Sequence, residues 1–342
     1  MASSDRLCVV TGAFGYTGRH IARLLLDHGL RVRTLTNHPR IDDPFGGAVE
    51  VRPLNFLNSE ELRESLRGAD TLINTYWVRF AWGGETHESA VDHTKALIDA
   101  AKQAGVRRLV HVSITNPSAD SDLSYFCGKG KLEEFIRGAG ISYAILRPTV
   151  LFGPGDILIN NIAWILRHFP VFGIPGRGDY RLQPVFIGDF AAKAVESIEG
   201  GANVTADVVG PEVYTFAELV KTMKGILRSR CAIVPVPPLM TLAAAKAIGM
   251  LLGDVVLTPD EVKGLMRNLL VSNQPPLCNA RLSDWLRQNA SSVGAHYASE
   301  LGRRRARPRD VHQFQSRRAV RSEIEDVSDR KRELNCLLRG GR

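Results

Sequence analysis

Between residues 6 and 148, short apolar runs alternate with segments in which apolar residues recur every three or four positions. The first pattern predicts strands buried on both faces, and the second predicts amphipathic helices. This alternation is typical of an α/β fold with a doubly wound parallel sheet, joined by right-handed crossovers. The expected strands are residues 6–12, 31–36, 48–54, 70–76, 107–113 and 141–148, with helices at 16–29, 59–69, 85–105 and 125–140.

After Pro148 the alternation becomes less regular. A Gly/Pro-rich turn is followed by apolar helical patterns at 157–170 and 215–228, and by a strand that runs into a helix at 182–199. We therefore expect residues 1–149 to form the sheet domain. Residues 150–302 would form a smaller, discontinuous C-terminal α/β lid domain that partly returns to the sheet.

The most apolar segment is residues 239–257. It contains Lys246 and Asp254 and is interrupted by Gly249 and Gly253, whereas a spanning helix needs about 20 predominantly apolar residues. We therefore expect a core or lid helix and no transmembrane helix. A helix lying at a membrane surface is the weaker alternative, so peripheral membrane contact stays open.

Charge separates the end of the chain from the rest. Residues 303–342 hold 13 Lys/Arg and 6 Asp/Glu, so they carry +7 of the net charge of +8. We expect this basic tail to be disordered, because it is poor in apolar residues. The remainder shows no basic–aromatic strip, so no nucleic-acid partner is expected.

The cysteines are five, scattered, and without a C-x-x-C pair. They predict free thiols, a cytoplasmic location and no metal site.

The strongest motif is TGAFGYTG at residues 11–18, a G-x-x-G-x-x-G pattern between the first strand and the first helix. In this context Gly12 allows a tight turn, Gly15 lets the backbone approach a pyrophosphate, and Gly18 lets helix and strand pack closely. Residues 1–149 are therefore predicted to be an NAD(P)-binding Rossmann domain. Loop residues expected to contact the cofactor are Gly12, Phe14, Gly15, Tyr16, Thr17 and Gly18.

The end of the second strand reads TLTNHPR and has no acid to bond a ribose 2′-hydroxyl. Arg40 or Arg33 would instead meet a 2′-phosphate, so we expect NADP(H) to be preferred, with NAD(H) as the alternative. Further cofactor contacts are expected at Asn37, His38, Arg40, Asn55, Phe56, Thr75, Tyr76, Pro148, Thr149 and Val150.

Tyr125 and Lys129 are four residues apart on a predicted helix, so both side chains lie on one face. A nearby ammonium group favours the phenolate, so the pair is a candidate for proton transfer. The spacing alone is common and carries weight only beside the nucleotide motif.

Together, the glycine motif, HVSITNPS after the fifth strand, Tyr125 with Lys129, and LRPTVLFGPGD after the sixth strand give the chain a family resemblance. It resembles the extended and atypical, epimerase/dehydratase-like branch of the short-chain dehydrogenase/reductase superfamily. Within that branch it is most similar to the nucleotide-binding accessory subunits of respiratory complex I and their bacterial relatives. The likeness covers residues 6–302 and leaves out the tail.

The resemblance implies hydride transfer with Tyr125 as the acid/base. It also implies that Lys129 bonds the nicotinamide ribose and lowers the Tyr125 pKa, and that Ser113 or Thr115 orients a substrate carbonyl. Tyr76, Trp77 and Phe80 depart from the small residues usual after the fourth strand, and would narrow the substrate side. Two functions therefore stay open: an oxidoreductase or epimerase acting on a small molecule, or a non-catalytic NADPH-binding subunit or assembly factor of a larger complex.

Overall fold

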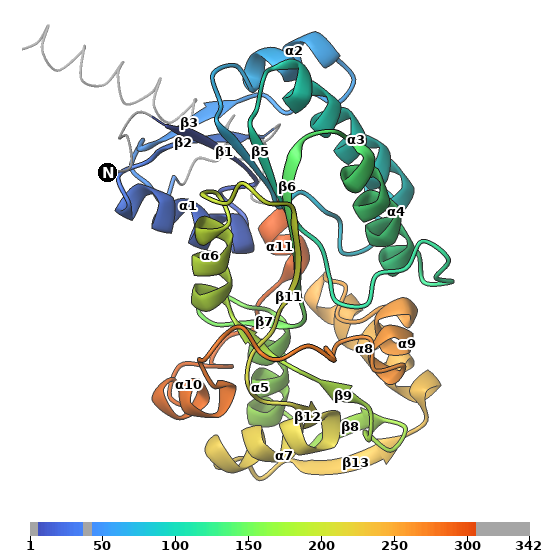
Figure 1. The fold of residues 1–342 in the computed structure, drawn as a ribbon. Coiled ribbons are helices and arrows are strands. Elements are labelled where there is room, and N and C mark those ends of the chain that lie inside the picture. Colours follow the sequence, from blue (N-terminus) through green and yellow to red (C-terminus); the bar gives the residue numbers. More distant parts are fainter. Residues whose placement is uncertain (1–5, 37–42, 306–342) are drawn as a thin grey trace, which may run out of the picture.

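The computed structural model describes residues 6–36 and 43–305 (Figure 1). Its centre is a seven-stranded parallel sheet in the order β11-β6-β5-β4-β1-β2-β3. The predicted doubly wound α/β fold is confirmed, and the reversal of strand order beside β1 creates the crevice in which such sheets bind ligands. The strands are β1 (Leu7–Thr11), β2 (Arg31–Leu35), β3 (Val49–Arg52), β4 (Thr71–Asn74), β5 (Arg108–Val112), β6 (Ser142–Pro148) and β11 (Val204–Val208).

Helices cover both faces of this sheet and build two separate cores. On one face, α1 (Tyr16–Asp27) and α6 (Ile187–Glu196) pack against alternate strand residues such as Val10 and Ile73. On the other, α2 (Ser59–Ser65), α3 (His87–Gln103) and α4 (Ser124–Gly138) pack against Val9 and Leu72. Burying each Leu, Ile or Val side chain stabilises the fold by roughly 1.5–3 kcal/mol, so both layers hold the strand ends in place.

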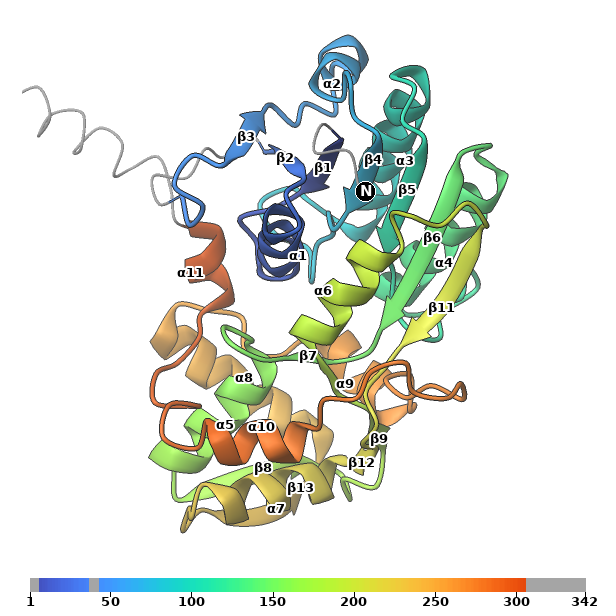
Figure 2. The ribbon, with the colours of Figure 1, turned by 60° about the vertical axis from the view of Figure 1, so that its left-hand side comes forward.

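The C-terminal region has a core of its own around two helices, α5 (Leu158–His168) and α7 (Phe216–Ile226). β11 and α6 return from it to the large sheet, as Figure 2 shows. Thr215 caps α7 through a capping box with Glu218. The remaining elements of this region are β7 (Leu151–Phe152), β8 (Val171–Pro175), β9 (Arg181–Leu182), β10 (Val185–Phe186), β12 (Tyr214–Thr215), β13 (Ala232–Val236) and α10 (Leu282–Gln288).

The apolar segment expected to be a core or lid helix is α8 (Pro238–Leu252), which is followed by α9 (Pro259–Met266). It lies at the surface: Ala245 and Gly249 are its buried residues, while Met250 and Leu251 are 71% and 87% exposed. Within the described residues, no helix is both long and apolar enough to cross a membrane. The last described element is α11 (Glu300–Arg305), and most of the basic tail lies outside the described residues.

Candidate functional site

The glycine-rich loop joins β1 to α1 at the centre of the sheet edge. Gly12 has a φ of +69°, which favours glycine, and its carbonyl accepts a hydrogen bond from the Gly15 N–H at 2.7 Å. A Cβ at Gly18 would lie 2.2 Å from the Gly12 oxygen, so only glycine lets α1 approach the loop this closely. Gly15 is the N-cap of α1 and has no side chain to bond the first-turn N–H groups, which fits an anionic ligand there.

The aromatic residues of this loop point away from one another. Phe14 is buried and packs against Phe45, so its side chain belongs to the core and not to a cofactor surface. Tyr16 turns toward the C-terminal region, near Gly155, and its hydroxyl is buried without a hydrogen-bond partner among the described residues. Thr17 is half-buried in the first turn of α1.

The Thr11 hydroxyl ties the end of β4 to the loop. Its Oγ1 accepts hydrogen bonds from the N–H groups of Thr75 and Tyr76, at 2.8 and 3.1 Å, and donates to Asn74. Thr75 therefore lies beside Gly12. Its contact with a cofactor stays a prediction.

Tyr76 and Phe56 pack against each other and against His93 of α3. The Tyr76 hydroxyl lies 3.0 Å from Nδ1 of His93, and the Phe56 ring stacks on the same imidazole with centroids 4.3 Å apart. Asn55 donates to Glu61 at 2.7 Å, in the turn that precedes α2.

Arg33 does not face a 2′-phosphate. The side chain is buried, and its guanidinium donates to Glu50 and to the carbonyl oxygens of Ser65 and Arg67. The suggestion that Arg33 meets the phosphate is therefore wrong, because these bonds hold the guanidinium against β3 and the end of α2. Asn37, His38 and Arg40 lie outside the described residues.

Tyr125 is half-buried near the start of α4, between two rings. The Trp77 and His87 rings each meet it edge-on, with centroids 5.6 Å away. Burial raises the pKa of Tyr125, and the Glu261 carboxylate raises it further while Arg79 opposes them. Lys129 does not lower the Tyr125 pKa here, contrary to what the resemblance implies.

Lys129 points into the protein, and only 2% of it is exposed. Its Nζ donates to the Val112 carbonyl at 2.7 Å and lies 4.4 Å from the centroid of the Trp77 ring. Burial lowers the pKa of Lys129 to about 7, although the Glu133 carboxylate opposes this shift. The ammonium group is therefore enclosed by the end of β5 and by an indole ring.

Trp77 is the residue that closes this part of the site. Its ring stacks on His87, with centroids 5.8 Å apart and planes 8° apart, and lies against α4 at Gly128. A Cβ at Gly128 would be 2.8 Å from the indole, so this glycine makes room for the ring. The sequence places Trp77 near the substrate side, but its contact with Gly128 has no sequence signal.

The two candidate hydroxyls are both engaged with protein atoms. Ser113 donates to Glu133 at 2.6 Å, and Thr115 donates to the Leu269 carbonyl at 3.0 Å. Glu133, which the sequence did not single out, is buried and also receives hydrogen bonds from Arg137 and Arg147. This network ties Ser113 to α4 and β6. The hydroxyl groups of Ser113 and Thr115 therefore both donate to protein atoms.

The C-terminal region covers Tyr125 from the other side. Leu269 and Leu270 pack with Ile114, Leu123 and Phe126 around the phenol ring. Arg79 pairs with Glu261, which joins the loop after β4 to α9. The half-buried Tyr125 side chain thus contacts Trp77, His87 and this apolar cluster.

Pro148, Thr149 and Val150 carry the chain from β6 into the C-terminal region and are all buried. The Thr149 hydroxyl donates to the Gln183 carbonyl. The three residues therefore fix the approach of the C-terminal region to the sheet.

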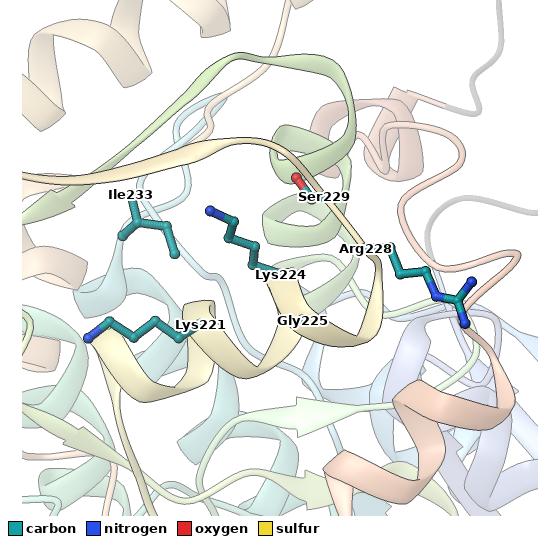
Figure 3. Close-up of a pocket in the computed structure, with 6 residues that line it drawn as sticks. All are labelled: Lys221, Lys224, Gly225, Arg228, Ser229 and Ile233. Atoms are coloured by element: carbon teal, nitrogen blue, oxygen red, sulfur yellow. The ribbon is translucent and has the colours of Figure 1, made fainter.

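Away from the glycine loop, a shallow hollow of about 510 Å³ lies between α7 and β13 (Figure 3). Lys221, Lys224 and Arg228 line it, together with Ile233. Within the described residues, no group of three His, Cys, Asp or Glu side chains is placed to hold a metal ion.

Comparison with known proteins agrees with an NAD(P)-binding domain in this part of the chain. A family described as NAD(P)H-binding matches residues 12–156, which include the glycine loop, Tyr125 and Lys129. The mitochondrial NADH dehydrogenase (ubiquinone) 1 alpha subcomplex subunit 9 of Arabidopsis thaliana is 25% identical over 289 residues, covering 79% of this chain and 72% of that protein. A ceramide reductase of Caulobacter vibrioides is 26% identical over 243 residues, covering 69% and 76%.

Among solved structures, a nucleoside-diphosphate-sugar epimerase from Staphylococcus aureus superposes with a TM-score of 0.62 at 18% identity. The match covers 86% of this chain and 97% of the epimerase, so the two share a fold. The Rossmann sheet, the NAD(P)H-binding match and these relatives confirm that the chain resembles the extended and atypical branch of the short-chain dehydrogenase/reductase superfamily.

Proposed function

We propose that this chain binds NAD(P)(H) as a stabilising ligand and does not turn it over through Tyr125. One observation carries the proposal: the Trp77 ring lies over the Lys129 ammonium group and against the edge of Tyr125. In the family, a substrate and the nicotinamide ribose need these two groups. The glycine loop fits the pyrophosphate, while the acid/base end of the site is filled by protein side chains.

The neighbouring hydrogen bonds support the same function. Lys129 is bonded to Val112, Ser113 to Glu133, and Thr115 to Leu269. The bond from Ser113 to the Glu133 carboxylate is charge-assisted and contributes about 1.5–3 kcal/mol, whereas the neutral bond from Thr115 to Leu269 contributes about 0.5–1.5 kcal/mol. A ligand that recruits these hydroxyls has to replace both bonds. Cofactor binding would then stabilise the folded chain without supporting a reaction.

We propose NADP(H) as the preferred cofactor, with NAD(H) as the alternative. The absence of Asp and Glu from Leu35 to Arg40 supports it, because an acid there would repel a 2′-phosphate. Titration with NADPH and NADH separates the two, and equal affinities would contradict the preference.

We propose that the partner is a protein in a larger complex, as the name of the Arabidopsis relative implies for that protein. The exposed apolar face of α8 supports this, since contiguous apolar patches on a surface mark interaction sites. Unpaired Cys8, Cys127, Cys231 and Cys278 support a reducing, cytoplasmic location.

The main experiment compares ligand-induced stabilisation with turnover. We expect saturating NADPH to raise the melting temperature, because a ligand that binds only the folded state stabilises it by mass action. No NADPH oxidation is expected with a panel of aldehydes, ketones and quinones. Tyr125→Phe should leave both results unchanged, and NADPH oxidation that this substitution abolishes would refute the proposal.

The proposed protein complex is tested by measuring the size of the species that contains this chain. In mild extracts, the chain should migrate with a large assembly, and Met250→Asp together with Leu251→Asp should release it as a smaller species. Leu57→Asp is the matched control, because Leu57 is also an exposed leucine but lies outside α8. A release by the control, or none by the α8 variant, would exclude α8 as the contact.

A reductase acting on a small carbonyl substrate is the second candidate. It is favoured by the position of Tyr125 one helical turn before Lys129 in α4. A bound nicotinamide would supply the hydride. Tyr125 would supply the proton to the carbonyl oxygen, after Trp77 had moved.

A further inference from the structure

The end of the described chain folds back across the C-terminal region to reach the glycine-rich loop. Asn160 and Asn161, in α5, hold it through paired side-chain bonds. Asn160 accepts from the Gly294 N–H and donates to the His296 carbonyl, both at 2.9 Å. Asn161 accepts from the Ala298 N–H and donates to the Ala298 carbonyl, also at 2.9 Å. These bonds fix the path of residues 294–298.

Asp254 fixes the next stretch. Its carboxylate accepts hydrogen bonds from the Tyr297 hydroxyl and from the N–H groups of Glu300 and Leu301, each at 2.9 Å. The Leu301 side chain is buried. The start of α11 is therefore held in place by Asp254. Both ribbon views show α11 beside α1 (Figures 1 and 2).

Arg303 is the residue that this path delivers to α1. Its guanidinium donates to the Gly155 carbonyl, and its Cζ lies 5.5 Å from the centroid of the Tyr16 ring. Tyr16 is the first residue of α1. Arg303 thus brings a positive charge to the helix end where the backbone N–H groups face an anion.

The Asp156 carboxylate lies near Arg303 and would compete with an anionic ligand for its guanidinium. Asp156, Glu300 and Arg19 all act electrostatically on Arg303. Asp156 is buried, and one of its carboxylate oxygens has no hydrogen-bond partner among the described residues. A role limited to balancing Asp156 is therefore the alternative that the experiment has to separate.

We propose that Arg303 binds the phosphates of the dinucleotide, so that residues 294–303 form a C-terminal clasp over the glycine loop. The inference rests on the proposed nucleotide binding and adds a residue to it from the opposite end of the chain. A guanidinium matches phosphate oxygens in two parallel hydrogen bonds, which an ammonium group does not. The clasp also explains why the Asn160, Asn161 and Asp254 side chains bond backbone rather than solvent.

The test measures the NADPH dissociation constant of full-length protein by fluorescence titration at several NaCl concentrations. Arg303→Gln should weaken binding roughly tenfold, the loss of one charge-assisted contact, and should reduce the dependence on salt. Arg303→Lys should recover part of the affinity. Arg267→Gln is the control, because Arg267 forms an exposed pair with Asp122 and should leave the constant unchanged.

The outcomes distinguish the role of Arg303 in the clasp from nucleotide binding itself. If wild type binds NADPH and Arg303→Gln binds it within twofold of wild type, the clasp is refuted and the nucleotide site stands. If Arg303→Gln lowers the melting temperature of the ligand-free protein and weakens NADPH equally at all salt concentrations, Arg303 only balances Asp156. If wild type binds no dinucleotide, both proposals fail.

Discussion

The ammonium nitrogen of Lys129 lies 4.4 Å from the centroid of the Trp77 indole ring. A cation over an indole face is stabilised by roughly 2 kcal/mol when it is removed from water, so the ring partly replaces the solvent that Lys129 lacks. The same ring lies against Tyr125 and Gly128. The Trp77 side chain therefore contacts both Tyr125 and Lys129.

Replacing Trp77 by alanine should uncover this pair. The half-buried ring should cost less than the about 3–5 kcal/mol of a fully buried one, so the variant is expected to fold. We expect Trp77→Ala to gain NADPH oxidation with small aldehydes, and the gain to vanish in the double variant with Tyr125→Phe. Trp82→Ala is the control, because Trp82 is an exposed tryptophan of the same loop. An inactive Trp77→Ala variant would mean that the ring is not what prevents turnover.

The lowered pKa of Lys129 predicts a rise of stability with pH. It is about 7 in the folded chain against an ordinary value of 10.5. Between these values the unfolded chain binds more protons, so the free energy of unfolding should increase from pH 7 to pH 9.5, by up to a few kcal/mol. Urea unfolding at both pH values measures it. Lys129→Met should lose the increase, whereas exposed Lys131→Met should keep it; equal slopes in both variants would contradict the assignment.

Asp156 predicts the opposite slope at lower pH. Burial raises its pKa from 3.8 to about 6, so the folded chain binds the proton more tightly. Its contribution is fully present below pH 3.8 and is lost as pH rises through about 6, a change of about 3 kcal/mol at most. Asp156→Asn keeps an oxygen for the Ile159 and Asn160 N–H groups, so it should be more stable than wild type at pH 8.

Asp120→Asn provides the comparison for that measurement, since Asp120 is exposed. The stability of Asp120→Asn should equal that of wild type at every pH between 4 and 8. If Asp156→Asn also follows wild type, then Asp156 is ionised in the folded chain across the whole range.

The sequence predicts the sheet and the glycine loop because both depend on local patterns. Apolar runs mark the strands, and Gly12, Gly15 and Gly18 mark the turn. The contact of Trp77 with Gly128 has no such signal, because it joins two segments that meet only through tertiary packing. The prediction that Arg33 meets a 2′-phosphate is wrong for a related reason. The sequence places Arg33 on the second strand, but the Ser65 and Arg67 carbonyls that accept its hydrogen bonds come from a helix end distant in sequence.

Glu133 shows how much of the site depends on a residue that the family pattern does not include. Its carboxylate is 1% exposed and bonds Ser113, Arg137 and Arg147, so Glu133→Gln leaves one neutral carbonyl oxygen where two charged oxygens accepted from three side chains. Breaking such a pair costs about 3–5 kcal/mol, and we expect Glu133→Gln to lose about 3 kcal/mol in urea unfolding.

Glu134→Gln is the matched control, one residue along α4 and exposed, and should change stability by less than about 0.5 kcal/mol. The NADPH dissociation constant of both variants should equal that of wild type under conditions in which both are folded, because Glu133 is a residue of α4 that bonds Ser113 and Arg147 and not the glycine loop. Equal stability losses in the two variants would show that the network contributes nothing beyond the helix itself. A selective loss of NADPH affinity in Glu133→Gln would instead place Ser113 and Lys129 in contact with the cofactor.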